Sequence, residues 1–409
     1  MKFPKELILM ILFALGSACK EKAKEEKNLA KENTLKELQF EKRAIADSVS
    51  FLWAHDPADV SEDGIADLVF VENNQAGGKF GFFMGQKEDG SWSKQLITDD
   101  ASKAVEFAMG DIETADMDND GDLDIVAARH IGEWEAASDP SQLYWFENPS
   151  WEAHFIGEIP NFIKDLSLED FNGDGQMEIA ALTFEESTIS VFQKNEDGWT
   201  RVLYHQGYKN LHEGMDVGDV NGDGYSDIVA DGHVFYSPGQ QLDAPWDTDN
   251  VDEKWNSQTG DWSRNGTKMF LRDLDGDKKS EVFISHSERP GYPLSYYRQV
   301  EGQWQENVIA DSIPACHTLQ VFDFDQDGFF DVLAGPNKTR AEDLGFTDYP
   351  VTIFRGSEGY NTWTPVVIAR DGIYNGQAID YDKDGDLDIF RYQTHDAVSY
   401  ELLENKIID

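Results

Sequence analysis

A nine-residue acidic segment occurs seven times along this 409-residue chain, and this segment most constrains how the chain can fold. The clearest copy is Asp116–Asp124, DMDNDGDLD, with carboxylates at positions one, three, five and nine and Gly121 at position six. Oxygen atoms at this spacing suit Ca²⁺, which takes six to eight of them, and glycine permits the sharp turn. The segment therefore predicts a calcium-binding loop, although a single copy would fit a metal-free acidic turn equally well.

The same frame begins again at residues 59, 170, 219, 273, 323 and 380, so that successive copies start 49 to 57 residues apart. Seven copies at a near-constant period indicate an internal repeat rather than chance. Two copies depart from the template. Ser61 replaces an acid in the first, and Lys278 replaces glycine in the fifth, where calcium is least expected. In the six loops other than the fifth, the predicted calcium ligands are Asp59, Asp63, Asp67, Asp116, Asp118, Asp120, Asp124, Asp170, Asn172, Asp174, Glu178, Asp219, Asn221, Asp223, Asp227, Asp323, Asp325, Asp327, Asp331, Asp380, Asp382, Asp384 and Asp388.

Short strands are predicted after every acidic loop. A β-branched or apolar run such as Ile125–Ala128 is followed by an aromatic-rich run such as 143–148, and then by a segment led by tryptophan such as 151–156. These runs are short and bounded by Gly, Asn or Pro, as strands are. With the strand that enters the loop, each repeat has four strands, although the fourth repeat lacks a clear Trp-led strand and carries an insertion at 243–262. Seven such units predict an all-β, seven-bladed β-propeller over residues 38–409.

The loop frame and the four-strand period resemble those of the FG-GAP/VCBS repeat proteins, which share the pattern D-x-[DN]-x-D-G-x-x-D and a propeller fold. The resemblance covers residues 40–409. It implies a propeller with several bound Ca²⁺ ions, and it says little about activity. Some propellers of this repeat type resemble carbohydrate lyases and dehydratases, such as the N-terminal propeller of fungal aldos-2-ulose dehydratase. Carbohydrate chemistry is therefore one implied activity.

The last repeat runs through three strands, at 378–379, 387–391 and 398–403, and has no Trp-led fourth strand. Residues 38–46, LQFEKRAIA, read like the fourth strands elsewhere, such as 303–311. We therefore expect this N-terminal segment to pair beside the C-terminal strand and to close the ring in blade seven. Closure of this kind removes two exposed sheet edges, which otherwise invite aggregation.

The N-terminus predicts export. Two lysines precede the apolar run Leu7–Leu15, which is too short to span a membrane and is typical of a signal peptide over residues 1–18. The small residues before Cys19 resemble a bacterial lipoprotein cleavage site, at which that cysteine becomes lipidated; a plain signal peptide is the alternative. Residues 19–37 are mostly charged or polar and predict a solvated tether. We expect a lipid-anchored protein at a bacterial cell surface or facing the periplasm, with no other membrane contact.

The charge of the chain excludes one class of partner. There are 79 Asp and Glu against 34 Lys and Arg, which gives a formal net charge of −45. Such a surface repels nucleic acid and anionic membranes. The sequence also contains no nucleophile elbow, phosphate-binding loop or HExxH zinc pattern.

Up-and-down strand order places the acidic loops on one face of a propeller. The loops before the first strands and those between the second and third strands lie on the opposite face, here called the top face. Several top-face loops are long and rich in His, Arg and aromatic residues, and long ordered loops on rigid scaffolds tend to carry function. The candidate catalytic or binding residues are His212, His317, Lys268, Arg289, His286 and Tyr374, and all of them except Tyr374 are expected to line one cavity at the channel mouth.

The strands entering the loops predict a polar channel. Residues three and five positions before each loop's first Asp are mostly polar, and strand period two turns them toward the axis. In a proton-abstraction reaction, His212, His317 or Tyr374 could be the base. Lys268, Arg289 or a second divalent metal held by top-face histidines could stabilise the enolate. The alternatives are an inert, water-filled channel and histidines with ordinary loop or core roles.

These observations favour a cell-surface, calcium-stabilised propeller that binds, and could also process, a carbohydrate or other extracellular ligand on its top face. One alternative is a carbohydrate lyase or dehydratase that acts by proton abstraction at the channel mouth. The other is a scaffold for protein–protein interaction.

Overall fold

A computed structural model describes residues 37–47, 49, 52–72, 79–85, 90–97, 110–130, 140–183, 188–206, 214–256, 268–286 and 290–408. The predicted signal peptide, Cys19 and the tether up to residue 36 lie outside the described residues. Within the described ranges, no helix is long and apolar enough to cross a membrane.

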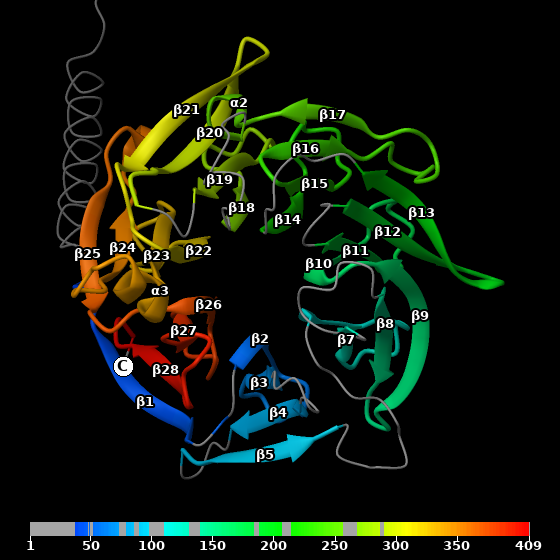
Figure 1. Ribbon diagram of the computed structural model, residues 1–409, viewed down its shortest axis with the longest axis horizontal. Coiled ribbons are helices and arrows are strands. Elements are labelled where there is room, and N and C mark those ends of the chain that lie inside the picture. Colours follow the sequence, from blue (N-terminus) through cyan, green and yellow to red (C-terminus); the bar gives the residue numbers. More distant parts are fainter. Residues whose placement is uncertain are drawn as a thin grey trace, which may run out of the picture.

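The described strands form seven four-stranded antiparallel sheets, which stand as blades in a ring around a central axis (Figure 1). Blades one to three consist of β2 (Leu52–Ala58), β3 (Asp67–Glu72), β4 (Lys79–Gly85) and β5 (Trp92–Leu96); β6 (Ile112–Ala115), β7 (Asp124–His130), β8 (Pro140–Glu147) and β9 (Glu152–Pro160); and β10 (Ile163–Glu169), β11 (Glu178–Thr183), β12 (Thr188–Asn195) and β13 (Gly198–Gln206).

Blades four to seven consist of β14 (Met215–Gly218), β15 (Asp227–Ala230), β16 (His233–Tyr236) and β17 (Asp247–Asn250); β18 (Lys268–Arg272), β19 (Glu281–Ser285), β20 (Leu294–Val300) and β21 (Gln303–Ala310); β22 (Cys316–Phe322), β23 (Asp331–Pro336), β24 (Val351–Arg355) and β25 (Thr364–Ala369); and β26 (Tyr374–Ile379), β27 (Asp388–Tyr392), β28 (Ser399–Asn405) and β1 (Phe40–Asp47). The predicted all-β, seven-bladed propeller is confirmed.

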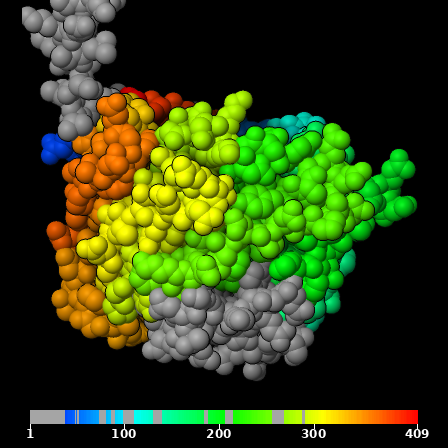
Figure 2. Space-filling view, turned by 90° about the horizontal axis from the view of Figure 1, so that it is seen from above, coloured from blue at the N-terminus to red at the C-terminus, as the bar shows by residue number. Residues whose placement is uncertain are grey.

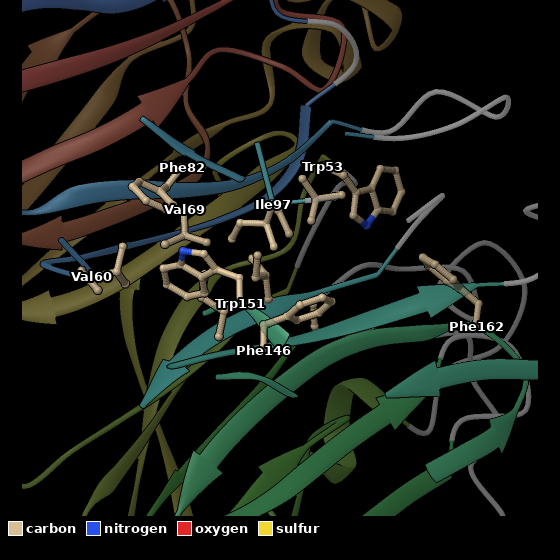
Figure 3. Close-up of a cluster of buried hydrophobic side chains, with 14 residues drawn as sticks. Trp53, Val60, Val69, Phe82, Ile97, Phe146, Trp151 and Phe162 are labelled. Atoms are coloured by element: carbon tan, nitrogen blue, oxygen red, sulfur yellow. The ribbon is translucent and has the colours of Figure 1, made fainter. Parts of the chain in front are cut away.

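The core lies between neighbouring blades, because each sheet packs face to face on the next. Every residue of β11 and of β23 is buried, which explains why second strands read as continuous apolar runs. Between blades one and two, Val69 and Phe82 meet Phe146 and Trp151 (Figure 3). The ring centroids of Phe82 and Trp151 are 5.7 Å apart.

The ring closes as expected. β1 pairs antiparallel with β28, from Phe40 opposite Asn405 to Asp47 opposite Ser399, and becomes the outermost strand of blade seven. The fully buried guanidinium of Arg391 lies 2.8 Å from carboxylate oxygens of both Asp371 and Glu401 beside this strand. The N-terminal segment therefore supplies the fourth strand that the last repeat lacks.

Blade four departs most from the repeat. Its outermost strand, β17, lies inside the insertion, has the polar sequence DTDN and is only four residues long. The neighbouring outermost strands β13 and β21 have nine and eight residues. A short helix, α2 (Glu253–Asn256), follows β17, and another, α3 (Lys338–Asp343), follows β23. Figure 2 shows the ring from the side, with blades four to six following one another in green, yellow and orange.

Candidate metal loops and channel site

The seven acidic loops share one backbone frame. In every loop, a carboxylate oxygen of the first Asp accepts a hydrogen bond of 2.8 to 3.1 Å from the backbone N–H of the sixth residue. The fifth-position Asp accepts one from the N–H of the seventh residue, again at 2.8 to 3.1 Å. Lys278 keeps this frame with φ of 70°, in the left-handed region that Gly121 occupies with φ of 105°. These bonds define the turn even at the position where glycine is missing.

The ninth-position acids also have a structural role that the sequence analysis missed. Asp124, 1% exposed, accepts hydrogen bonds from the backbone N–H groups of Met117 at 3.1 Å and Asn148 at 2.8 Å. Asp388 accepts equivalent bonds from Tyr381 and Asn405. Each such carboxylate ties its loop to the end of the third strand of the same blade.

The residues of the seventh loop fit a cation best. Asp380, Asp382 and Asp388 each offer an oxygen, and these atoms lie within 4.8 Å of one another. The Oδ1 atoms of Asp380 and Asp382 are buried without a hydrogen-bond partner among the described residues. Buried polar atoms are almost always satisfied, so this pair indicates a missing partner such as a hard cation. Equivalent groups occur in the second, fifth and sixth loops: Asp116, Asp118 and Asp124; Asp273, Asp275 and Asp277; and Asp323, Asp325 and Asp331.

Three other loops contain a positive side chain of the protein itself. Arg355 forms an ion pair with Asp325 in the sixth loop. In the fifth loop, Arg298 lies 3.4 Å from Asp275 and 2.6 Å from Glu281. In the first loop, Lys383 lies 3.0 Å from Asp59. The calcium ligands predicted in all six loops stay predictions, and in the first and sixth loops a metal would have to compete with a side-chain cation.

The innermost strands of all seven blades enclose a central cavity of about 360 Å³. The residues three and five positions before each loop's first Asp line it, as the strand period predicts. The upper layer, five positions before, consists of Ala54, Asp111, Asp165, Gly214, Lys268, Thr318 and Asn375. The lower layer, three positions before, consists of Asp56, Glu113, Ser167, Asp216, Phe270, Gln320 and Gln377.

This lining has two chemically different sides. Its carboxylates all come from blades one to four, which also contribute His55 and Lys164, whereas blades five to seven contribute Lys268, His317, amide side chains and Phe270. Lys268 Nζ lies 3.8 Å from Asp165 Oδ1, at the boundary between the two sides. The cavity therefore concentrates its acids on one side, whereas the other side offers ammonium, imidazole and amide groups without a carboxylate.

Several of the channel acids are partly protonated near neutral pH. Burial raises the pKa of Asp111 and of Asp216 to about 7, and that of Asp56 to about 6. Burial and four neighbouring carboxylates raise the pKa of Glu113 well above its usual value. Because a protonated carboxyl can donate as well as accept a hydrogen bond, this side can pair with hydroxyl groups in either sense.

The channel residues also fasten each blade to the next. Asp111 accepts a hydrogen bond from the backbone N–H of Leu166 in the following blade at 2.9 Å, and Asp216 accepts one from Leu271 at 2.6 Å. Asp165 and Thr318 make corresponding bonds to Gly214 and Gly376. The polar lining is therefore part of the ring's architecture as well as a candidate site.

Asn375 organises the upper part of the channel. It adopts φ of 47° at an irregularity in the pairing of β26 with β27. Its Nδ2 donates to the carbonyl of Trp53 at 3.1 Å, which leaves Oδ1 to accept from His317 Nδ1 at 3.0 Å. Neutral His317 then carries its lone pair on Nε2. The ring of Tyr374 stacks on that of His317, with centroids 4.1 Å apart.

The structure places the predicted site residues as follows. Lys268 and His317 line the same cavity, and Tyr374 supports His317. The expectation is wrong for His286, which is not part of this lining and is buried against Asp252 in a separate cluster. His286 and His317, the two predicted site histidines that the structure describes, therefore do not belong to one metal-binding cluster. His212 and Arg289 lie outside the described residues.

Comparisons with known proteins agree with the fold. The FG-GAP-like repeat family matches residues 116–181 and 170–230. The search of curated proteins gave no match. Among solved structures, the exotype rhamnogalacturonan lyase YesX superposes with a TM-score of 0.51 at 12% identity, over 90% of this chain and 76% of that one. The Bacillus licheniformis rhamnogalacturonan lyase PL11 gives 0.51 at 12%, over 90% and 75%.

A third similar structure, BBS1N in its complex with ARL6DN, has a TM-score of 0.50 at 10% identity, over 90% of this chain and 96% of that one. At such low identity these likenesses establish the fold alone. The chain is a seven-bladed β-propeller that contains FG-GAP-like repeats.

Proposed function

We propose that this protein is an exported, calcium-stabilised β-propeller that binds a carbohydrate in the upper part of its central channel. The observation that carries the proposal is the two-sided lining, in which partly protonated acids face Lys268, His317 and amide groups across one cavity. Sugar hydroxyls donate and accept hydrogen bonds at once, and such a lining offers partners of both kinds. The two similar rhamnogalacturonan lyases support a carbohydrate ligand by analogy of fold.

Calcium and export are parts of the same proposal. The acidic groups of the second and seventh loops could hold a metal, and all-oxygen sites of this kind suit Ca²⁺. Lipidation of Cys19 would hold the propeller at the membrane through the charged tether. Membrane fractionation of the full chain and of Cys19→Ala tests this part, since loss of the lipid should release the protein into the soluble fraction.

The ligand is tested by titrating the calcium-loaded protein with a panel of oligosaccharides in a calorimeter. Lys268→Met keeps the apolar stem but removes the ammonium, and we expect it to weaken binding at least tenfold. His317→Asn should do the same, whereas His154→Asn, on outer strand β9, should leave affinity unchanged. Melting temperatures of all three variants control for folding. Wild-type binding that survives both channel substitutions would place the ligand elsewhere.

A second candidate is an elimination reaction, favoured by the contact between His317 and Asn375. With Nδ1–H held by Asn375, His317 Nε2 is the atom that could take a proton from the carbon beside a carbonyl or carboxylate. The electron pair of that C–H bond would form a carbon–carbon double bond as the hydroxyl or glycosyl group on the next carbon leaves. The ammonium of Lys268 would stabilise the enolate, and a protonated channel acid would supply a proton to the departing oxygen.

This reaction creates a conjugated product, so ultraviolet absorbance during incubation with oligosaccharides detects it. We expect product formation to be lost in His317→Asn and in Lys268→Met. Binding without any unsaturated product would restrict the protein to ligand capture.

A further inference from the structure

We propose a second ligand site, for a neutral sugar ring, in the groove between the outer parts of blades four and five. A cavity of about 390 Å³ lies there, separate from the central channel, and is lined by β17, α2 and the β20–β21 hairpin. This volume falls within the range of about 300 to 1,000 Å³ typical of small-molecule pockets. The inference does not depend on the function proposed for the channel.

The groove exists because of the insertion in the fourth repeat. The outer strand of blade four, β17, has four residues, whereas the outer strand of blade five, β21, has eight. Because β17 is shorter, it extends along only part of the length of β21. The chain then turns into α2, whose residues Glu253 and Lys254 form part of the cavity wall.

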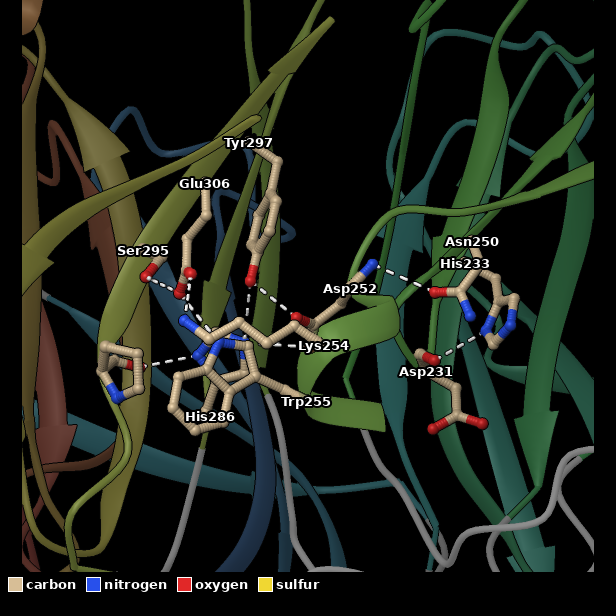
Figure 4. Close-up of polar contacts among 11 residues, drawn as sticks. Asp231, His233, Asn250, Asp252, Lys254, Trp255, His286, Ser295, Tyr297 and Glu306 are labelled. Atoms are coloured by element: carbon tan, nitrogen blue, oxygen red, sulfur yellow. Dashed lines mark hydrogen bonds and ion pairs between the residues drawn. The ribbon is translucent and has the colours of Figure 1, made fainter. Parts of the chain in front are cut away.

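The wall of this groove is held rigidly by a buried cluster (Figure 4). His286 donates through Nδ1 to the carbonyl of Pro293 at 2.7 Å, and its Nε2 lies 2.9 Å from Asp252 Oδ2. The hydroxyl of Tyr297 donates to the other oxygen of Asp252 at 2.6 Å. Asp252 and Tyr297 both line the cavity. His286 thus anchors the insertion to blade five, and a rigid wall lowers the entropy cost of binding.

A second set of contacts joins α2 to β20 and β21 of blade five. Glu306 accepts hydrogen bonds from Lys254 Nζ at 2.6 Å, Trp255 Nε1 at 2.8 Å and Ser295 Oγ at 3.1 Å. The Trp255 ring lies against His286, with centroids 5.5 Å apart. Both ends of the insertion's contact with blade five are therefore defined by side-chain hydrogen bonds (Figure 4).

The lining combines aromatic and hydrogen-bonding groups. Trp304 is half-buried at the groove, and its Nε1 donates to Asp249 Oδ2 at 2.9 Å. Asn250, Gln303 and Lys254 add donors and acceptors around it. A sugar ring has an apolar face that stacks on indole and a hydroxyl rim that pairs with such groups.

The charges of the lining select a neutral ligand. Asp249, Asp252, Glu253 and Glu306 outnumber the single ammonium of Lys254, which opposes an anionic ligand such as a uronate. An organic cation would have to displace donors that already occupy these carboxylates. Glu306 accepts from Lys254, Trp255 and Ser295. Asp252 contacts His286 and Tyr297, and Asp249 accepts from Trp304. A neutral pyranose meets neither obstacle.

The test is a saturation-transfer NMR and calorimetric titration of the calcium-loaded full chain. The probes are methyl glycosides of glucose, galactose, mannose and rhamnose, with glucosamine and glucuronate as charged counterparts. We expect at least one neutral glycoside to bind, and Trp304→Ala to weaken it at least tenfold. Trp199→Ala is the matched control, because Trp199 occupies the equivalent place in β13 and does not line the groove.

If Trp304→Ala folds poorly, Asp249→Asn is the second variant. We expect Asp249→Asn to weaken binding several-fold, whereas Asp247→Asn on the same strand should leave binding unchanged. Lys268→Met, in the channel, should leave this affinity unchanged, which separates the two sites. The proposal is overturned if none of the neutral glycosides binds, if glucosamine or glucuronate binds in their place, or if binding survives both groove substitutions.

Discussion

Lys383 Nζ lies 3.0 Å from Asp59 Oδ2, so that a side chain of the seventh acidic loop gives a positive charge to the first. Arg298 and Arg355 do the same within the fifth and sixth loops. The seven loops look alike in sequence, yet they divide into loops with a side-chain cation and loops whose acids are left to a metal. Only the second group should depend on calcium.

We expect a chelator to lower the melting temperature and calcium to restore it, because an ion that binds only the folded state stabilises that state. Asp120→Ala, in the second loop, should reduce the calcium-dependent gain. Asp277→Ala, at the equivalent position of the fifth loop, should leave it unchanged. Calorimetric melting curves with elemental analysis check both. Equal losses in the two variants, or no metal in the protein, would refute this division of the loops.

Arg391→Met should be strongly destabilising. Its guanidinium is fully buried between Asp371 and Glu401, and the substitution leaves these two carboxylates with only the half-exposed Lys42 as a cationic partner. Breaking a buried ion pair in this way costs about 3 to 5 kcal/mol. The matched control is Arg370→Met, because Arg370 pairs with Asp348 at the exposed surface, where such pairs contribute about 1 kcal/mol or less. Urea unfolding of both variants measures the difference, and similar midpoints would contradict it.

Removing β1 should prevent soluble expression. A chain that begins at residue 49 lacks the strand that pairs with β28, so two sheet edges stay exposed. A chain that begins at residue 37 keeps β1 and should remain soluble and monomeric. Size-exclusion chromatography distinguishes the two. A stable, monomeric chain without β1 would show that closure is dispensable.

Asp216→Asn should stabilise the protein at pH 8. Burial raises the folded-state pKa of Asp216 to about 7 from an ordinary value of 3.8, so the folded state binds this proton more tightly than the unfolded state does. The carboxylate therefore costs stability above that range, and the cost shrinks as the pH falls toward 4. The amide oxygen of asparagine can still accept the Leu271 N–H without a charge. Melting curves from pH 8 to pH 5 should show the gain diminishing, and a loss at pH 8 would contradict it.

Most of the fold could be predicted because the acidic loop and its four strands recur seven times along the sequence. The frame around Asp116 locates each turn, and alternation along the inner strands locates the channel-facing side. The pairing of residues 38–46 with the last strand followed from counting strands, since an unpaired edge is costly. β17 could not be predicted, because its polar sequence DTDN is a strand only through its partner β16.

The candidate site was less predictable, since it depends on contacts between blades. Lys268 and His317 meet because inner strands converge on one axis, which the repeat implies. The tautomer of His317 depends on a backbone irregularity at Asn375, and no local pattern announces it. His286 was assigned to the wrong place because its loop position says nothing about Asp252 in the preceding blade.

The pairing of β1 with β28 also determines when folding of this protein can be completed. Phe40 is among the first described residues to be synthesised, and its partner Asn405 is among the last. During translation, β1 is synthesised first, but it has no partner strand until β28 has been synthesised. Blade seven can therefore form only after the other six blades are complete in sequence. A chain truncated before β28 would therefore leave β1 without its partner strand and one edge of β27 unpaired.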